Sequence, residues 1–279
     1  MSRVISVTNR KGGPSKTTSV VNLAGAFAAL DLKVLVIDLD PQGSATNFFL
    51  DPQVGESLPL ELTVGSLFTD DFFLADRSKL ITPTEIENIS VVPNNEHSDP
   101  LNSPVRETWE SHQTSLLEFT RDECEDFDVI ILDFPPSLYL LAWAGLIASD
   151  YVIIPVPPEM FSTQGLRHVH RMVAEAREIR PDLRRLGHFV SRRKRSRTHT
   201  FILESLKERF GKELFHSTLS EYHDYMEVSA LGQPLEVCRP KTKAATEVRA
   251  LRDEIIERIN ESETRRYADK SEGSHGNKK

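Results

Sequence analysis

The feature that most constrains this chain is a short glycine-containing loop at residues 10–18, which reads Arg-Lys-Gly-Gly-Pro-Ser-Lys-Thr-Thr. An apolar run at 4–7 precedes the loop, and a segment with apolar residues at helical spacing follows it. Strand, glycine loop and helix together build a phosphate cradle, because backbone N–H groups and the helix N-terminus then face a polyphosphate. In such a cradle Lys16 adds a full positive charge, and the hydroxyl of Thr17 is a ligand for Mg²⁺.

The loop departs from the usual P-loop pattern, G-x-x-x-x-G-K-[ST]. Arg10 stands at the first glycine position of that pattern and Ser15 at the second, while Lys11 comes directly before the glycine pair. An ordinary glycine turn with a solvated lysine is the alternative that the loop alone leaves open. The rest of the chain has to decide between the two.

Acidic residues follow two apolar segments further along the chain. Residues 33–38 and 127–133 have the composition of buried strands and end in Asp38 and Asp133, and Asp40 comes two residues after the first strand. Two apolar strands joined by an amphipathic helix predict a parallel βαβ unit, whose ligands bind beyond the carboxyl ends of the strands. A carboxylate there can hold the water shell of Mg²⁺ or orient an attacking water. Helix capping, or closure of the Asp-Pro turn, is the alternative role for Asp38 and Asp40.

Strands and helices alternate along the rest of the chain. This order predicts an α/β fold, with a doubly wound, mostly parallel sheet and helices on both faces. We expect a single domain over residues 1–266 and a disordered tail at 267–279. Further strands are predicted at 89–92, 151–155, 186–190 and 214–219, and further helices at 63–67, 115–120, 138–147, 163–180, 202–210 and 243–265.

Composition narrows the class of function. The net charge of −8 over 279 residues argues against a protein that coats nucleic acid with its whole surface. A local exception is the run Ser-Arg-Arg-Lys-Arg-Ser-Arg at 191–197. Cys124 and Cys238 have no metal-ligand spacing, and we find no signal peptide and no apolar run of membrane-spanning length. A reducing cytosol is the expected setting.

Five motifs of this chain resemble the ParA/MinD family of deviant-Walker P-loop ATPases, in particular ParA-type partition proteins without an N-terminal helix-turn-helix domain. A lysine directly before the glycine pair is the mark of the deviant class. The motifs come in the family's order and span nearly the whole chain: K-G-G-x-x-K-T-T at 11–18, D-x-D-P-Q-G at 38–43, D-V-I-I-L-D-x-P-P-S at 128–137, I-P-x-x-x-E at 154–159, and G-x-P with the following P-K-T-K at 232–243.

The resemblance implies a cytoplasmic, nucleoid-associated ATPase with a weak intrinsic rate, which binds ATP and Mg²⁺ and closes into a homodimer around ATP. Lys16 would bind the β- and γ-phosphates, and Lys11 would reach across the dimer to the partner's nucleotide. Asp40 would orient the hydrolytic water and is a further candidate for the Mg²⁺ shell, while Thr17 would ligate Mg²⁺ and Asp133 would hold it through water. The residues implied to contact the nucleotide are Gly12, Gly13, Pro14, Ser15, Lys16, Thr17 and Thr18.

The resemblance also implies partners. Members of this family bind DNA non-specifically and are released when a cargo-bound ParB-like protein or another cargo adaptor stimulates hydrolysis. Their cargo is a plasmid, a chromosome or a protein assembly. Where DNA-binding members often have Pro-Arg-x-x-Arg, this chain has the acidic segment 220–224. We therefore expect the DNA contacts to come from the basic run, through Arg192, Arg193, Lys194, Arg195 and Arg197.

Several alternatives stay open at this point. The basic run could be a solvated loop or a loop close to the nucleotide, and the C-terminal helix is the next candidate for a DNA surface. Ser15 stands where the family usually has glycine, so slow or altered hydrolysis with intact binding is a further expectation. A MinD-like membrane regulator is disfavoured because the chain ends in polar residues without an apolar helix face. A redox relative such as the nitrogenase iron protein would need cysteines placed to hold a cluster.

Overall fold

The computed structural model describes residues 2–10, 15–69, 76–159 and 162–275. Within these residues, eight strands form one sheet in the order β3-β4-β2-β5-β1-β6-β7-β8, and all neighbours are parallel except β3 and β4. The strands are β1 (Arg3–Val7), β2 (Val34–Asp38), β3 (Thr82–Pro83), β4 (Ile89–Val92), β5 (Val129–Asp133), β6 (Tyr151–Val156), β7 (Arg184–Arg193) and β8 (Leu214–Ser220).

Helices connect these strands and follow the last one. They are α1 (Ser15–Ala28), α2 (Ser44–Phe49), α3 (Pro52–Ser57), α4 (Ser115–Asp122), α5 (Leu140–Ala148), α6 (Ser162–Ile179), α7 (Arg197–Phe210), α8 (Asp224–Leu231), α9 (Leu235–Cys238) and α10 (Lys243–His275). Short 3-10 turns cover Leu60–Leu62, Val64–Phe68, Arg77–Leu80, Glu96–Leu101, Arg106–Thr108 and Gly211–Glu213.

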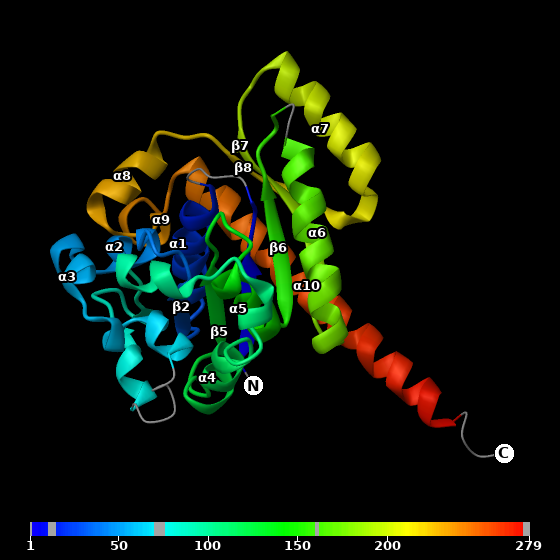
Figure 1. The fold of residues 1–279 in the computed structure, drawn as a ribbon. Helices are drawn as coiled ribbons and strands as arrows, with labels where there is room; N and C mark the ends of the chain where they lie inside the picture. Colours follow the sequence, from blue (N-terminus) through cyan, green and yellow to red (C-terminus); the bar gives the residue numbers. More distant parts are fainter. Residues whose placement is uncertain (1, 11–14, 70–75, 160–161, 276–279) are drawn as a thin grey trace.

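Hydrophobic cores lie on both faces of the sheet. Side chains alternate between the two faces along each strand, so in β2 Leu35 and Ile37 enter one core while Val34 and Val36 enter the other. The first core is covered by helices α4, α5, α6 and α7 (Figure 1). The second core is covered by α1, α2, α8, α9 and α10. The predicted doubly wound α/β class, with helices on both faces, is confirmed.

Helix α1 is held in place by contacts with α9 and by a hydrogen bond within the helix. Asn22 donates from Nδ2 to the carbonyl of Thr18 at 2.8 Å and accepts from the backbone N–H of Leu235 at 2.9 Å. Gly25 lets α9 approach closely, because a Cβ at that position would lie 2.4 Å from Cβ of Pro234. The first turn of α1 is therefore fixed relative to the sheet.

The structure differs from the sequence expectations mainly near the basic run. Strand β7 continues to Arg193 instead of ending at Val190, because it pairs with β8 up to the register Arg193↔Ser220. Helix α7 begins at Arg197 instead of Ile202, and the hydroxyl of Ser196 caps it by accepting from the N–H of His199 at 3.2 Å. The basic run therefore covers a strand end, a short connection and a helix start.

The C-terminal helix also differs from its expected extent. Helix α10 runs to His275, ten residues beyond the predicted end at Arg265, and its distal part projects away from the body in Figure 1. No proline interrupts residues 243–275, so nothing in the local sequence forces the helix to stop earlier. The division into one domain at 1–266 and a tail stays a prediction.

Candidate functional site

The predicted acidic residues and the described end of the predicted loop, residues 15–18, meet at the carboxyl ends of three neighbouring strands. Strand β5 lies between β1 and β2, with Asp133 in register with both Val7 and Asp38. Helix α1 starts at Ser15 on the same edge, so Lys16 and Thr17 occupy its first turn. Of the predicted nucleotide loop, Lys11, Gly12, Gly13 and Pro14 lie outside the described residues.

Asp133 and Thr17 form the centre of this site. The hydroxyl of Thr17 donates to Oδ2 of Asp133 at 2.7 Å. Asp133 is fully buried, and its second oxygen, Oδ1, has no hydrogen-bond partner among the described residues. A buried carboxylate oxygen without a partner is costly unless the site holds a cation or an ordered water. Since hydroxyl and carboxylate oxygens are ligands of Mg²⁺ and its water shell, the residues present fit that ion.

The charge of Asp133 is adjustable. Burial raises its pKa to about 7, although the hydrogen bond from Thr17 and the positive charge of Lys16 oppose this rise. Lys16 is itself only 4% exposed, and burial lowers the pKa of its ammonium group, while the carboxylates of Asp133 and Asp40 act in the opposite direction. Among the residues that the structure describes here, the buried cation of Lys16 thus lies near carboxylates, an arrangement that suits an anionic ligand accompanied by a metal ion.

Asp38, the other buried carboxylate, has a structural role. Its Oδ1 accepts from the N–H of Asp40 at 3.0 Å, and its Oδ2 accepts from the N–H and the hydroxyl of Thr46 at 2.8 and 2.9 Å. These bonds tie the turn after β2 to the first part of α2. Burial and then the charge of Asp133 raise the pKa of Asp38 well above its usual range. Of the two roles left open for Asp38, the structure supports the turn-closing one.

Asp40 lies at the tip of this turn and is half-buried. Its Oδ1 accepts from the N–H of Gln42 at 3.1 Å, and its carbonyl accepts from the N–H of Gly43 at 2.8 Å. Gly43 has a φ of 61°, and a Cβ there would lie 2.7 Å from the carbonyl oxygen of Asn94, so the turn requires glycine. Burial raises the pKa of Asp40, and the charge of Lys16 counteracts that rise. The turn thus places Asp40 within electrostatic reach of Lys16.

Sequence reasoning missed a residue that closes this edge of the sheet. Asn9, two residues after the end of β1, is buried and donates from Nδ2 to the carbonyl of Pro155 near the end of β6, at 2.7 Å. The bond joins the start of the phosphate loop to the neighbouring strand. A polar residue close behind an apolar strand was the available signal, but nothing in the sequence names its partner.

A cavity of about 630 Å³ adjoins the first turn of α1, and the sequence did not predict it. Ser15, Thr18 and Ser19 form one side, and residues from the ends of β7 and β8 and from α8 form the rest. Two lining side chains carry buried hydroxyl oxygens without a hydrogen-bond partner in the described part of the chain, Oγ of Ser191 and the phenolic oxygen of Tyr225. Unpaired hydroxyls at the wall of a cavity indicate a polar ligand.

The five cations of the basic run do not form one uniform surface. Arg192 and Lys194 both pair with Glu221, at 3.5 and 3.1 Å. Arg193, Arg195 and Arg197 are exposed and form no ion pair within the described residues. Arg192 also lines the cavity beside α1, so part of the run lies near the site, as one of the alternatives proposed. The run thus combines a paired part at the cavity with an unpaired part in solvent.

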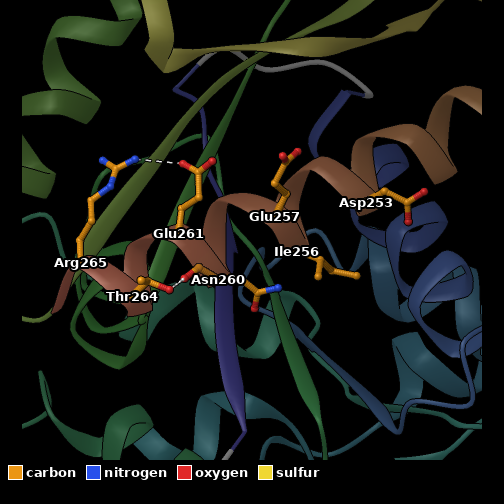
Figure 2. A pocket seen from close by; sticks show the side chains of 7 residues that line it. All are labelled: Asp253, Ile256, Glu257, Asn260, Glu261, Thr264 and Arg265. Atoms are coloured by element: carbon orange, nitrogen blue, oxygen red, sulfur yellow. Dashed lines mark hydrogen bonds and ion pairs between the residues drawn. The ribbon is translucent and has the colours of Figure 1, made fainter. Parts of the chain in front are cut away.

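One exposed stretch of helix α10, the other candidate for a nucleic-acid surface, is acidic. Figure 2 shows a surface hollow whose lining residues all come from α10, with Asp253, Glu257 and Glu261 along it. Its one cation, Arg265, is paired with Glu261 at 2.9 Å. Because carboxylates repel nucleic-acid phosphates, this stretch is a poor surface for DNA, while the exposed Lys243 and Arg266 of α10 lie outside it.

Comparison with known proteins decides the family. The family model described as an AAA domain (AAA_31) matches residues 2–185. The Sporulation initiation inhibitor protein Soj of Bacillus subtilis is 30% identical, over 88% of this chain and 94% of that protein. This chain belongs to the ParA/MinD family of P-loop ATPases. The Chromosome partitioning protein ParA of Myxococcus xanthus is 28% identical to it, over 95% of this chain and 91% of that protein.

Solved structures extend the likeness to the fold of the whole chain. The structure of cobyrinic acid a,c-diamide synthase from Mycobacterium smegmatis with bound ATP analog and magnesium has a TM-score of 0.76 and 25% identity, and the match covers 93% of this chain and 96% of that one. Because that protein is a synthase, the shared fold does not by itself decide what this family member does. None of the described helices has the length and apolarity needed to cross a membrane.

Proposed function

We propose that this protein is an ATP-dependent partition or positioning ATPase. In this proposal it binds ATP and Mg²⁺, forms a homodimer around the nucleotide, and binds DNA non-specifically as a cytoplasmic, nucleoid-associated protein. A cargo-bound ParB-like partner stimulates hydrolysis and releases it. The observation that carries the proposal is the Thr17–Asp133 hydrogen bond beside buried Lys16, at the edge where β1, β5 and β2 end.

Each residue of the site has a role in the proposed cycle. Lys16 binds the β- and γ-phosphates, and Thr18 contacts the α-phosphate. Thr17 and Asp133 hold Mg²⁺ with its water shell, and the bound ion neutralises phosphate charge when it is present. Asp40 orients the attacking water and is a further candidate for the Mg²⁺ shell. Lys11 reaches the nucleotide of the partner subunit, so hydrolysis depends on dimerisation.

The cavity beside α1 fits the nucleoside part of the same ligand. It begins at Ser15 and Thr18, where the phosphate loop enters α1, and it leads away from Lys16 towards β7 and β8. The unpaired hydroxyls of Ser191 and Tyr225 are available to hydrogen-bond the base or the ribose. A ligand whose phosphates lie at α1 would then fill both parts of the site.

The DNA-binding step is assigned to the basic run. Arg193, Arg195 and Arg197 are exposed between the end of β7 and the start of α7 and are suited to sequence-independent phosphate contacts. Use of the same cycle to position a protein cargo on the nucleoid is the second candidate. Both readings share the ATPase steps and differ only in the partner that stimulates hydrolysis.

A comparison of wild type with Lys16→Ala tests the nucleotide half of the proposal. Wild type is expected to bind ATP with Mg²⁺ and to retard random-sequence duplex DNA more strongly when ATP is present. Lys16→Ala is expected to lose ATP binding and, with it, the ATP-dependent gain of DNA binding, as measured by fluorescent-nucleotide titration and gel shift. DNA binding by Lys16→Ala at the wild-type level would contradict the proposal.

Asp40→Ala separates binding from hydrolysis. Removal of a water-orienting carboxylate is expected to reduce kcat by about a hundredfold or more while ATP binding persists, because catalysis by such groups contributes factors of this size. The variant should accumulate as an ATP-bound dimer in size-exclusion chromatography with ATP. Hydrolysis by Asp40→Ala at the wild-type rate would rule out this role for Asp40.

A further inference from the structure

Glu221 connects the cavity beside α1 with the basic run. Strand β8 ends at Ser220, and the N–H of Glu221 donates to the carbonyl of Arg193 at 3.0 Å, which fixes the backbone of Glu221 to the end of β7. From this position its carboxylate pairs with Arg192 and Lys194. Glu221 and Arg192 both line the cavity. Glu221 is thus part of the cavity wall and also pairs with two of the five cations of the basic run.

The two ion pairs reduce the charge that the run presents to a phosphate backbone. Although its slight burial opposes the effect, the hydrogen bond from Lys194 and the charge of Arg192 keep the pKa of Glu221 below its usual range, so this carboxylate stays ionised near neutral pH. A cation that is paired with a carboxylate has to give up that pair before it can neutralise a DNA phosphate. Glu221 therefore competes with nucleic acid for Arg192 and Lys194.

The backbone at this point is also unusual. Arg192 has a φ of 55°, a left-handed conformation that is unfavourable for a residue with a Cβ. Such conformations occur where the surrounding structure holds them, and they are concentrated at ligand sites and switch segments. Arg192 combines this conformation with contact to the cavity and to Glu221.

We propose that Glu221 restrains Arg192 and Lys194 and so weakens nucleic-acid binding, and that a nucleoside in the adjoining cavity competes for the same carboxylate and frees the two cations. Ribose hydroxyls and base amino groups can donate hydrogen bonds to a carboxylate. The idea rests on the proposed function, since it assigns the regulation of the DNA-binding surface named there. It makes Glu221 a positioning residue that acts through two cations.

The expected size of the effect follows from the exposure of the pairs. The side chains of Glu221, Arg192 and Lys194 are 38%, 41% and 59% exposed. Exposed pairs of this kind change an equilibrium by no more than about fivefold each. A ligand with one or two hydrogen bonds to Glu221 can therefore overcome them, and loss of Glu221 should produce a moderate gain of DNA affinity.

The experiment compares Glu221→Gln with a matched control, Glu204→Gln. Both variants change the net charge by +1, but Glu204 pairs with Lys207 on the exposed face of α7 and does not line the cavity. Affinity for a random-sequence duplex is measured over a series of salt concentrations, with and without ATP and Mg²⁺. Thermal unfolding of each variant checks that the fold is intact, and Glu221→Asp, which keeps the charge, should behave as wild type.

Glu221→Gln is expected to bind DNA about fivefold more tightly without nucleotide, and the slope of log K against log salt should steepen by up to about 1.8, since two more cations can reach phosphates. Its gain of affinity on addition of ATP should be smaller than that of wild type. Glu204→Gln should change affinity by less than about twofold. Equal behaviour of the two variants would overturn the restraint, and an unchanged gain with ATP in Glu221→Gln would overturn the coupling to the cavity.

A further variant separates failure of this inference from failure of the proposed DNA surface. Combined substitution of Arg192, Arg193, Lys194 and Arg195 by alanine should weaken DNA binding and flatten its salt dependence. If this variant binds DNA as wild type does, the DNA surface proposed above is wrong. If it loses binding while Glu221→Gln matches its control, the DNA surface stands and the role of Glu221 is refuted.

Discussion

The two halves of the sheet edge that carries the strand ends hold their charges in different ways. Around β1, β5 and β2 the carboxylates are buried and held by short hydrogen bonds, as Asp38 and Asp133 show. Around β7 and β8 the charges of the basic run and Glu221 lie nearer to solvent, and the ion pairs of Glu221 with Arg192 and Lys194 are 3.5 and 3.1 Å long. A buried group has one geometry and a shifted pKa, whereas exposed pairs exchange partners at little cost. The first region suits chemistry with fixed geometry, and the second suits adjustable recognition.

The first prediction tests the fixed region with two buried aspartates that are neighbours in register. Asp133→Asn should lower the affinity for Mg²⁺ in the presence of ATP by about tenfold to a hundredfold. Loss of an oriented carboxylate near a metal has effects of this size. Titration of nucleotide binding with Mg²⁺ measures it.

Asp38→Asn is the matched control for Asp133→Asn. It removes the charge of a carboxylate that holds the turn after β2, so it should lower thermal stability and leave the Mg²⁺ affinity of the folded fraction near that of wild type. If Asp38→Asn lowers Mg²⁺ affinity as strongly as Asp133→Asn does, the division of roles between the two carboxylates is wrong.

The second prediction tests whether burial, and not position along the sheet, causes the shifted pKa values. His188 lies in β7 beneath the basic run, fully buried, with its Nε2 at 2.8 Å from that of His170 and its ring stacked on Phe210 at 4.1 Å. Burial, followed by the nearby His170, lowers the pKa of His188 to about 3. Since the unfolded chain takes up a proton at this side chain below pH 6.5 and the folded protein does not, stability is full above pH 6.5 and falls as the pH decreases towards 3.

This group alone should lower the free energy of unfolding by about 2 kcal/mol between pH 7 and pH 5. Urea unfolding at both pH values measures it, and His188→Leu provides the reference in which that part of the pH dependence is absent. If His188→Leu loses as much stability between pH 7 and pH 5 as wild type does, the lowered pKa of His188 does not contribute to the pH dependence of stability.

The smallest effect is expected for the exposed region. Lys194→Ala removes one ion pair with Glu221, and because both side chains are well exposed the free energy of unfolding should change by less than about 0.5 kcal/mol. Chemical unfolding of wild type and variant side by side measures it. A loss of several kcal/mol would mean that this pair is structural, and the contrast between the two regions would disappear.

Much of the fixed region could be predicted from the sequence. The apolar strands and the acids that follow them were visible, and in a parallel sheet the strand ends share one edge. The division of roles between Asp38 and Asp133 was not visible, because it depends on Thr46 and Thr17 as hydrogen-bond partners. The bond from Asn9 to Pro155 and the burial of the Ser191 hydroxyl at the cavity wall could not be predicted either, because both depend on residues that are distant in the sequence.

By itself, the sequence determined the α/β fold, the helix that begins after the glycine-containing motif and the acids at the neighbouring strand ends, because local motifs and the periodicity of apolar residues carry that information. The basic run and the acidic segment at 220–224 were also visible, but as separate features with opposite implications for DNA. Only the tertiary structure decided that they are one feature. Pairing of β7 with β8 brings Glu221 against Arg192, 29 residues away in the chain, at the wall of the cavity. Charge partners over such separations are chosen by strand register, which a sequence pattern does not specify.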